Sequence, residues 1–386
     1  MIVTIVTETY LPDINGVAMT LDNLVSGIAR LGHKIQLVCP ERKKRTPESL
    51  HKNISYHPVR GMPIPGYNEV QFGLPSKSLL HKLWKSNIPD IIYVATEGPL
   101  GWNAVKTANK LNIPIISGFH TNFHSYSSHY NIGLLEKVVA QYLVKLHNKT
   151  EVTLTPSFGQ KLNIQKMGIN NVSVIGRGVD TDLFSAKKRS HKLRETWGVN
   201  TINEPVLLYV GRIAAEKNLE LAVKSYRKMY EINKKVKFVL VGDGPLLHKL
   251  KKDNPDFIFA GVKRGEELAQ HYASSDIFIF PSMSETFGNV VLEAMASGLG
   301  VIAYDYAAAS MHIYPGKNGQ LAYFGDSSKF VEKACIYLNN YLFLQRIQMN
   351  ASIYAKSQSW DEIIKQFESI LINYAFKNSK KEIMCG

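Results

Sequence analysis

Two glutamates eight positions apart, Glu285 and Glu293, stand out in this chain as residues whose types and spacing could do chemistry. A Phe-Gly-Asn turn follows Glu285, and a helix-like run, VVLEAMAS, carries Glu293. Eight positions on an α-helix are a little over two turns. The spacing therefore predicts both carboxylates on nearly the same helical face, with Glu285 at or just before the helix start.

The same segment, 281 to 305, has features of an anion-binding site. A strand-like run, DIFIF (276 to 280), precedes it. A helix that begins with Gly and polar residues after a strand offers free N–H groups and a positive dipole end to an anion. One segment would thus supply phosphate-binding geometry and two acceptors for sugar hydroxyls, which indicates an enzyme that uses a nucleotide sugar.

Two cations lie five positions apart in VGRIAAEKN (210 to 218), after the first strand-like run of the second half. Arg212 offers a planar fork and Lys217 a point charge, so together they can bracket a diphosphate. The alternative is that both form surface ion pairs. VGDGP (241 to 245) is a further Gly-rich turn that lies near a ribose or base, or is only a turn.

The segment TETYLPDINGVA (7 to 18) joins the first strand-like run to the first helix-like run. Gly16 allows a ligand to approach the backbone closely, and a helix start favours an anion. The alternative is a tight connection without a ligand. The full G-x-G-x-x-G fingerprint is absent, which argues against an NAD enzyme.

Three histidines, His120, His124 and His129, lie close together in GFHTNFHSYSSHY. No acidic ligand stands among them, so the segment does not favour a metal site. His120 directly follows the strand-like run IPIISGF, at the carboxyl end where α/β proteins bind ligands, so we expect a polar contact with substrate. For the other two we expect structural roles. Asp180-Thr181-Asp182 spells a D-x-D, for which metal binding and turn capping are the alternatives.

Short apolar strand-like runs alternate with helix-like runs throughout the chain, and the pattern restarts in the second half. This alternation predicts an α/β protein with two doubly wound, Rossmann-like domains of parallel strands. We place the first domain at 1–180 and the second at 181–358. A last helical segment with a polar tail occupies 359–386.

A chain of 386 residues with a net charge of +14 also favours two domains and suggests anionic partners. Basic stretches with apolar neighbours, KSLLHKLWKS (77 to 86) and LLEKVVAQYLVKLHNK (134 to 149), fit an anionic membrane surface or a solvated helix face. No nucleic-acid module accompanies them. Three distant cysteines, no secretory signal and no spanning segment lead us to expect a cytoplasmic protein, peripheral at the inner face of the plasma membrane.

The order of the motifs resembles glycosyltransferase family 4, a group of retaining enzymes of the GT-B fold. The resemblance covers nearly the whole chain. Its strongest part is S-x-S-E-T-F-G-N-V-V-L-E-A-M-A-S-G, joined by GR-x4-K, VGDGP, AGVKRGEEL and GRGVDTDLF. Within the family, INGVAMTL, TEGPLGW and GFHTNFHSY are similar to bacterial GDP-mannose-dependent α-mannosyltransferases. Sulfoquinovosyl-, glucuronosyl- and glucosyl-diacylglycerol synthases share much of the pattern.

The resemblance implies two domains facing across a cleft, the first on the acceptor side and the second binding the donor, with the last helix crossing back to the first. It also implies a role for each candidate residue. The diphosphate would meet Arg212, Lys217 and Gly16, the ribose Glu293, and the base the main chain at Val262; the sugar would meet Glu285, His120 near its 6-position, and the amides of Phe287, Gly288 and Asn289.

The implied activity is retaining hexosyl transfer, with mannose from GDP-mannose moved to a lipid or lipid-linked glycan. It requires no metal or cofactor besides the donor, because cations and a helix start stabilise the departing diphosphate. The alternatives are a UDP-sugar-dependent glycolipid synthase, a nucleotide-sugar epimerase or hydrolase, and a non-catalytic membrane-binding protein.

Two segments depart from the family pattern. Many members carry Gly-Gly where this chain has Asn15-Gly16, which bears on the contact of that loop with the diphosphate. AAASMHIYPGKNG (307 to 319) stands where many members carry Gly-Gly-x-x-Glu, and we expect it to reshape the pocket near the nucleotide.

Overall fold

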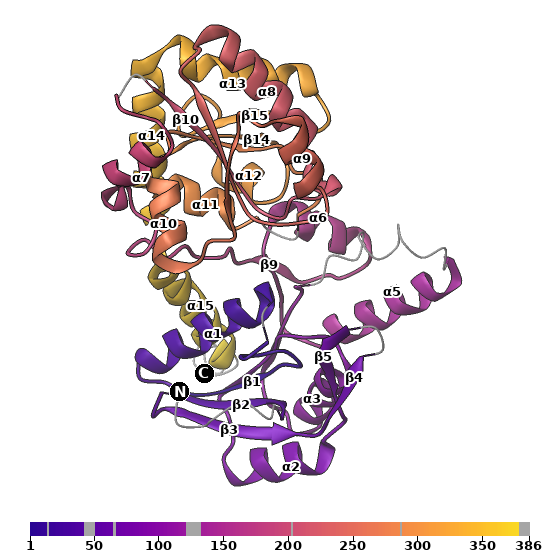
Figure 1. Ribbon diagram of the computed structural model, residues 1–386. Coiled ribbons are helices and arrows are strands. Elements are labelled where there is room, and N and C mark those ends of the chain that lie inside the picture. The colour runs from indigo at the N-terminus through magenta and orange to yellow at the C-terminus, as the bar shows by residue number, and fades with distance from the viewer. Residues whose placement is uncertain are drawn as a thin grey trace. The chain divides into compact units, whose positions relative to one another are not determined.

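The computed structural model describes residues 1–13, 15–41, 51–64, 67–120, 133–201, 204–285 and 288–377. The chain divides into two compact units (Figure 1). Unit 1 comprises Met1–Arg177 and Trp360–Gly386, and unit 2 comprises Gly178–Ser359.

Unit 1 is built on a parallel sheet in which the described strands follow the order β3-β2-β1-β6-β7-β8-β9. Strands β4 and β5 form a separate antiparallel pair. The strand bounds are β1 Ile2–Val6, β2 Lys34–Pro40, β3 Ile54–Val59, β4 Gly61–Ile64, β5 Tyr67–Gly73, β6 Ile91–Val94, β7 Ile115–Gly118, β8 Thr153–Thr155 and β9 Val172–Val174. Strand β1 has β2 on one side and β6 on the other, so the order in which strands are added to the sheet reverses there. Such a switch point is where α/β sheets bind ligands.

The helices of unit 1 cover this sheet. Their bounds are α1 Gly16–Arg30, α2 Lys77–Ser86, α3 Pro99–Lys110, α5 Gly133–His147, α6 Phe158–Lys166 and α15 Trp360–Ala375. The last of them packs against the first, α1 against α15, with Ile363, Ile364 and Phe367 in one core with Leu21 and Leu24. The final helix of the chain therefore belongs to unit 1.

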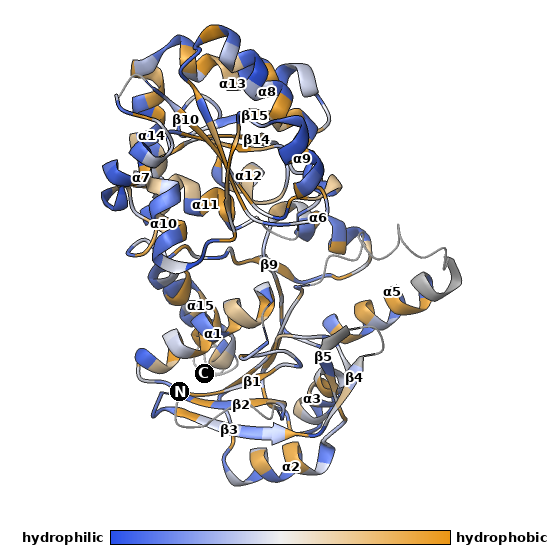
Figure 2. Cartoon of the chain, in the orientation of Figure 1, coloured by the Kyte–Doolittle hydropathy of each residue, from blue (hydrophilic) through white to orange (hydrophobic). Residues whose placement is uncertain are grey.

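Unit 2 holds a parallel sheet of the order β12-β11-β10-β13-β14-β15, which is the doubly wound arrangement of a Rossmann fold. The strand bounds are β10 Val206–Val210, β11 Lys237–Val241, β12 Ile258–Gly261, β13 Ile277–Phe280, β14 Gly300–Tyr304 and β15 Gln320–Ala322. The reversal point lies between the neighbours β10 and β13. The central strands β10 and β13 are continuous apolar runs, and the sheet is largely orange in Figure 2, as expected for strands buried on both faces.

The helices of unit 2 connect the strands. Their bounds are η2 Ala186–Lys188, α7 His191–Thr196, η3 Ala215–Lys217, α8 Leu219–Ile232, α9 Leu247–Asp253, α10 Gly265–Ala273, α11 Val290–Ala296, α12 Ala307–His312, α13 Ser327–Asn339 and α14 Tyr341–Lys356. Helix α9 is largely polar, blue in Figure 2, whereas α8 buries one apolar face that includes Leu221, Ala222 and Met229.

The fold class predicted from the sequence, α/β with two doubly wound Rossmann-like domains, is confirmed. The alternation rule missed the β3–β5 segment, whose residues mix polar and aromatic types with prolines instead of forming one apolar run. Among the described residues, no helix is both long and apolar enough to cross a membrane.

Candidate functional site

The carboxyl ends of β10 and β13 bring together two segments that are far apart in the sequence. Residues Gly211 to Lys217 follow β10, and Ser282 to Glu285 follow β13, its neighbour in the sheet. The first segment is fixed by backbone hydrogen bonds from Gly211 N to Val241 O (3.0 Å) and from Ile213 N to Asp243 O (2.8 Å). The VGRIAAEKN and VGDGP turns therefore pack on each other at the reversal point of the sheet.

Lys217 is held at the centre of this arrangement. Its ammonium group forms an ion pair with Glu285 and donates a hydrogen bond to the carbonyl oxygen of Ser284 (3.0 Å). Ser282 Oγ donates to the same carboxylate, at 2.8 Å from Glu285 Oε1. The side chains of Lys217 and Glu285 are 16% and 15% exposed, so a charge pair sits in a partly desolvated position. Such a charge-assisted pair is strongly oriented, and each of its side chains can exchange the other for a group of a ligand.

Arg212 differs from Lys217 in its surroundings. Its side chain is 65% exposed and lies 3.3 Å from Glu216 Oε1, a pair of the kind that contributes little to stability. Its backbone is fixed instead, because Tyr209 OH donates to the carbonyl oxygen of Arg212 at 2.9 Å. The surface ion-pair alternative thus describes Arg212 in this structure, while its guanidinium group stays accessible to an anion.

The prediction that Glu285 and Glu293 share a helical face is wrong. Helix α11 begins at Val290, five positions after Glu285, so Glu285 lies in the loop that follows β13. The cause is Gly288, whose φ of +91° is not helical and whose conformation favours glycine. A Cβ at Gly288 would lie 3.7 Å from Glu285 Cγ, so the turn folds back beside that glutamate.

Glu293 lies in the first turn of α11 and accepts a hydrogen bond from Tyr272 OH at 3.0 Å. Burial raises the pKa of its carboxyl to about 7, although the Tyr272 hydrogen bond acts in the opposite direction. The phenol itself has a raised pKa, chiefly through burial, so it remains a donor. A carboxyl group in this setting accepts hydrogen bonds from a hydroxyl ligand best when ionised.

The remaining candidates of unit 2 are Asn289, Phe287 and Val262. Asn289 precedes α11, and its buried Oδ1 has no hydrogen-bond partner among the described residues. Phe287 lies outside the described residues. Val262 follows β12 and is 57% exposed, with its backbone at the carboxyl edge of the sheet.

The Asp180-Thr181-Asp182 segment lies in a turn. Asp180 Oδ1 accepts hydrogen bonds from the backbone of Asp182 (3.1 Å) and Leu183 (2.9 Å). Asp180 therefore caps a turn, which is one of the two alternatives given for this segment.

In unit 1, the turn at Gly16 is organised by Asn15. The Asn15 side chain caps α1 and accepts from Val17 N (3.1 Å) and Ala18 N (2.9 Å), while its Nδ2 donates to Thr9 Oγ1 (2.8 Å). An anion at this helix start would therefore compete with Asn15 for two N–H groups. The departure from the family pattern at this position has a structural role, since Asn15 is extended (φ −145°) and supplies the cap.

His120 follows β7 and is buried, with its Nε2 2.8 Å from Tyr93 OH. Burial, with contributions from the charges of Arg177 and His147, lowers its pKa to about 3, so its imidazole is neutral near pH 7. Where Tyr93 donates to Nε2, the proton of His120 resides on Nδ1, which has no partner among the described residues. His124 and His129 lie outside the described residues.

The structure adds functional candidates that the sequence reasoning did not single out, of which Glu8 is the most notable. This buried residue follows β1, and its Oε1 accepts a hydrogen bond from Leu100 N (2.9 Å) at the start of α3. Burial raises its pKa to about 7, hydrogen bonds from the backbone of Leu100 and Gly101 oppose this, and the charge of Glu97 adds to it. A Cβ at Gly98 would lie 1.8 Å from Glu8 Oε2, so only glycine leaves room for the carboxylate.

Arg177 is a second such residue. It is buried beside the Gly16 turn, where a Cβ on Gly16 would lie 3.2 Å from its NH1, and burial lowers its pKa to about 10. A guanidinium group at this position still carries its charge at neutral pH. The sequence held one signal for each of these two residues. Glu8 is an acid directly after the first strand-like run, and Arg177 stands in the otherwise polar GRGVD segment.

Two protein-family profiles match this chain. The profile of "Glycosyltransferase Family 4" matches residues 14–183, and that of "Glycosyl transferases group 1" matches residues 204–340. The chain is 32% identical over 324 residues to the GDP-mannose-dependent alpha-mannosyltransferase of Mycolicibacterium smegmatis, covering 83% of this chain and 84% of that protein. It is 26% identical to the alpha-monoglucosyldiacylglycerol synthase of Acholeplasma laidlawii, covering 98% of each.

Among solved structures, the fold is similar to Anabaena Alr3699/HepE in complex with UDP. The TM-score is 0.74 at 19% sequence identity, over 97% of this chain and all of the other. Taken with the two Rossmann-like units, these matches show that the chain belongs to glycosyltransferase family 4 and has the GT-B fold.

Proposed function

We propose that this hexosyltransferase transfers mannose from GDP-mannose to a lipid or lipid-linked acceptor, with retention of configuration and without a metal ion. The observation that carries the proposal is the partly buried Lys217–Glu285 pair at the reversal point of the second sheet. The name of the Mycolicibacterium smegmatis relative supports GDP-mannose as donor.

The chemistry follows from charge. As the bond between sugar and diphosphate breaks, negative charge develops on the leaving group and positive charge on the sugar. The ammonium group of Lys217 and the accessible guanidinium group of Arg212 stabilise the developing phosphate charge more in the transition state than in the ground state. No general acid on the leaving group is required if these cations do that work.

Binding of the donor would rearrange the ion pair. Once a phosphate oxygen accepts from Lys217, Glu285 is released to accept hydrogen bonds from sugar hydroxyls, beside the backbone of Gly288 and Asn289. Glu293 accepts from the ribose, and the main chain at Val262 meets the base. The pair therefore keeps both side chains in place until a diphosphate and a sugar take over their interactions.

In unit 1, His120 supplies a neutral hydrogen-bonding group for the sugar near its 6-position. A neutral imidazole in a buried position can donate to a hydroxyl without adding charge near an oxocarbenium-like sugar. The Gly16 loop meets the diphosphate, with the charge of Arg177 beside it.

Contact with a membrane is proposed through the basic helices of unit 1. On α2, Lys77, Lys82 and Lys85 are exposed, whereas Leu80 and Trp84 are buried in the unit's own core. The apolar face of α2 is thus occupied, so its contact with anionic lipid would be electrostatic and would weaken with salt. Such contact fits a cytoplasmic protein peripheral to the inner face of the plasma membrane.

A panel of donors tests the choice of substrate. Thermal unfolding is recorded with GDP-mannose, UDP-glucose, UDP-glucuronate and UDP-sulfoquinovose, since a ligand at about 100 times its Kd stabilises the folded state by about 2.7 kcal/mol. Stabilisation by GDP-mannose alone supports the proposal. Stabilisation by uridine nucleotides alone favours the second candidate, a UDP-sugar-dependent glycolipid synthase, to which the name of the Acholeplasma laidlawii relative points.

Incubation with donor but no acceptor addresses the remaining alternatives. Rapid release of free sugar or of an epimer would identify a hydrolase or epimerase. A protein that binds vesicles but none of the four donors would be the non-catalytic alternative.

A further inference from the structure

A surface cavity of about 700 Å³ lies in unit 2 away from the candidate donor residues. Two of its lining residues, Pro205 and Asp276, directly precede β10 and β13. Lys217 and Glu285 follow the carboxyl ends of the same two strands. Because the strands are parallel, the cavity lies at their amino ends and the donor residues lie at their carboxyl ends.

One wall of the cavity is a single face of helix α14. The residues that contribute recur at helical spacing: Tyr341, Leu344, Gln348, Met349, Ser352, Ile353 and Lys356. Tyr341, Met349 and Ile353 are 48%, 60% and 60% exposed, so an apolar stripe faces solvent here. The stretch from Tyr341 to Lys356 is about 22 Å long at the rise of an α-helix. An extended ligand fits this shape better than a compact one.

The opposite wall contains a polar group without a partner. Ser297 is 2% exposed, and its Oγ makes no hydrogen bond to any described residue. Other buried serines of unit 2 donate to the carbonyl four residues earlier, as Ser225 does to Leu221 (2.8 Å) and Ser275 to His271 (2.9 Å). A buried hydroxyl without a partner is costly, so a ligand that supplies one gains affinity.

The charges of the lining favour an anion. Asp276 is the acid of the cavity, and its carboxylate is already shared by Arg189 (2.7 Å) and Arg194 (3.0 Å) and accepts from Val206 N (2.8 Å). Two guanidinium groups on one carboxylate leave a net positive charge. Lys356 is exposed and has no ion pair with a described residue, which adds a second positive charge.

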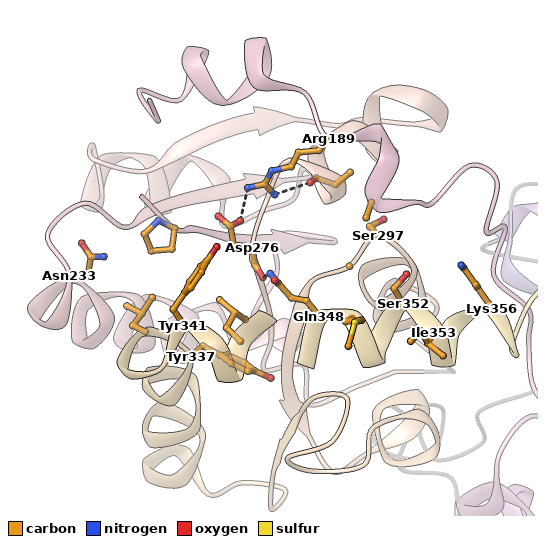
Figure 3. Close-up of a pocket in the computed structure, with 17 residues that line it drawn as sticks. Arg189, Asn233, Asp276, Ser297, Tyr337, Tyr341, Gln348, Ser352, Ile353 and Lys356 are labelled. Atoms are coloured by element: carbon orange, nitrogen blue, oxygen red, sulfur yellow. Dashed lines mark hydrogen bonds and ion pairs between the residues drawn. The ribbon is translucent and has the colours of Figure 1, made fainter. Parts of the chain in front are cut away.

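The two ends of the cavity differ, with Tyr341 at one and Lys356 at the other. Figure 3 shows Tyr341 and Lys356 at opposite ends of the lined stretch of α14, with Arg189 and Asp276 between them. Ser297 and Ser352 lie toward the Lys356 end in the same view. An anionic group near Lys356 would thus have hydroxyl donors beside it, and an apolar chain could extend along the helix toward Tyr341.

We propose that this cavity binds a single-chain amphiphile with an anionic head group, such as a fatty acid or a lysophospholipid. The head group lies between Lys356 and Ser297, and the chain covers Ile353, Met349 and Tyr341. The site is independent of the proposed sugar-transfer reaction, so the two can fail separately.

Calorimetry with monomeric dodecyl phosphate and laurate, both below their micelle concentrations, tests the proposal. We expect one site per chain, with octyl phosphate binding at least ten-fold more weakly because four methylenes are lost. Tighter binding of dodecyl phosphate assigns a phospholipid-derived ligand, and tighter binding of laurate a free fatty acid. Failure of both to bind overturns the proposal, as does equal binding of the cationic dodecyltrimethylammonium.

Matched variants locate the site. Ile353→Asp and Lys356→Glu should each weaken dodecyl phosphate at least ten-fold, whereas Leu342→Asp and Lys224→Glu should not. Leu342 is 76% exposed on the same helix but does not line the cavity, and Lys224 is exposed on α8. Thermal unfolding near the parent temperature verifies that each variant is folded. Equal affinity across all four variants contradicts the assignment, as would a chain that is dimeric through Ile353 and binds no amphiphile.

Discussion

Lys217 and Glu285 form an ion pair that joins the loop after β10 to the loop after β13. Ser282 completes the arrangement by donating to the same carboxylate. The two loops come from neighbouring strands at the point where the winding of the sheet reverses, so a side chain from each reaches the other without a distortion of either strand.

Lys217→Ala should lower kcat by about 100- to 1,000-fold, the range typical of losing one group that stabilises charge in a transition state. KM for the donor should change less, because the developing charge is greatest in the transition state. Steady-state turnover measures both. Lys224→Ala, an exposed lysine on α8, is the matched control and should leave turnover near the parent value.

Glu285→Gln should remove the charge partner of Lys217 and leave the ammonium group in a partly desolvated position. A double-mutant cycle with Lys217→Met should give a coupling free energy of unfolding of about 1 kcal/mol. Chemical denaturation of the four proteins measures it. Additive effects within experimental error would mean that the two side chains do not interact in solution.

Stability should depend on the titration of Glu293. Its folded-state pKa, about 7, is above the ordinary value of 4.5, so the folded protein binds this proton more tightly than the unfolded chain does. The contribution to stability is therefore full below pH 4.5 and is lost as the pH rises through 7, with a total on the order of 1–3 kcal/mol.

Glu293→Gln tests this assignment. The variant should lose that part of the pH dependence, so that its free energy of unfolding falls less between pH 5 and pH 8 than that of the parent. Glu8 has a pKa raised to about the same value and contributes with the same sign, so a residual slope is expected in Glu293→Gln. An unchanged slope in the variant would assign the dependence elsewhere.

Gly98→Ala should destabilise unit 1 by about 2 kcal/mol or more, because the added methyl group would overlap the buried carboxylate of Glu8. Gly159→Ala is the matched control. It lies in helix α6 with nothing within 4 Å of the added Cβ, so we expect it to be neutral or slightly stabilising. Thermal denaturation of the two variants compares them directly.

The sequence predicts much of this fold because its signals are local. Runs such as those of β10 and β13 are continuously apolar, and the last helical segment, expected within 359–386, contains helix α15, Trp360–Ala375. The site is less predictable because its key contact is not local. Lys217 and Glu285 are 68 positions apart, and no spacing rule pairs residues across two strands.

Two errors have definite physical causes. The eight-residue spacing of Glu285 and Glu293 matched a helical face, but the non-helical backbone at Gly288 leaves Glu285 in the loop before helix α11, which begins at Val290. Glu8 was overlooked because an isolated acid after a strand looks like a surface residue. Its burial depends on the start of α3 and on the absence of a side chain at Gly98, features that appear only when the chain is folded.

The most direct test of the proposed function is transfer itself. The protein is incubated with GDP-mannose and a lipid extract, and the lipid product is analysed by mass spectrometry and by the anomeric signals of its sugar in NMR. We predict a lipid that gains one hexose in the α configuration from GDP-mannose, without added metal, and almost no product with Lys217→Ala. A product formed only from UDP-sugars, or equal product from Lys217→Ala, would contradict it.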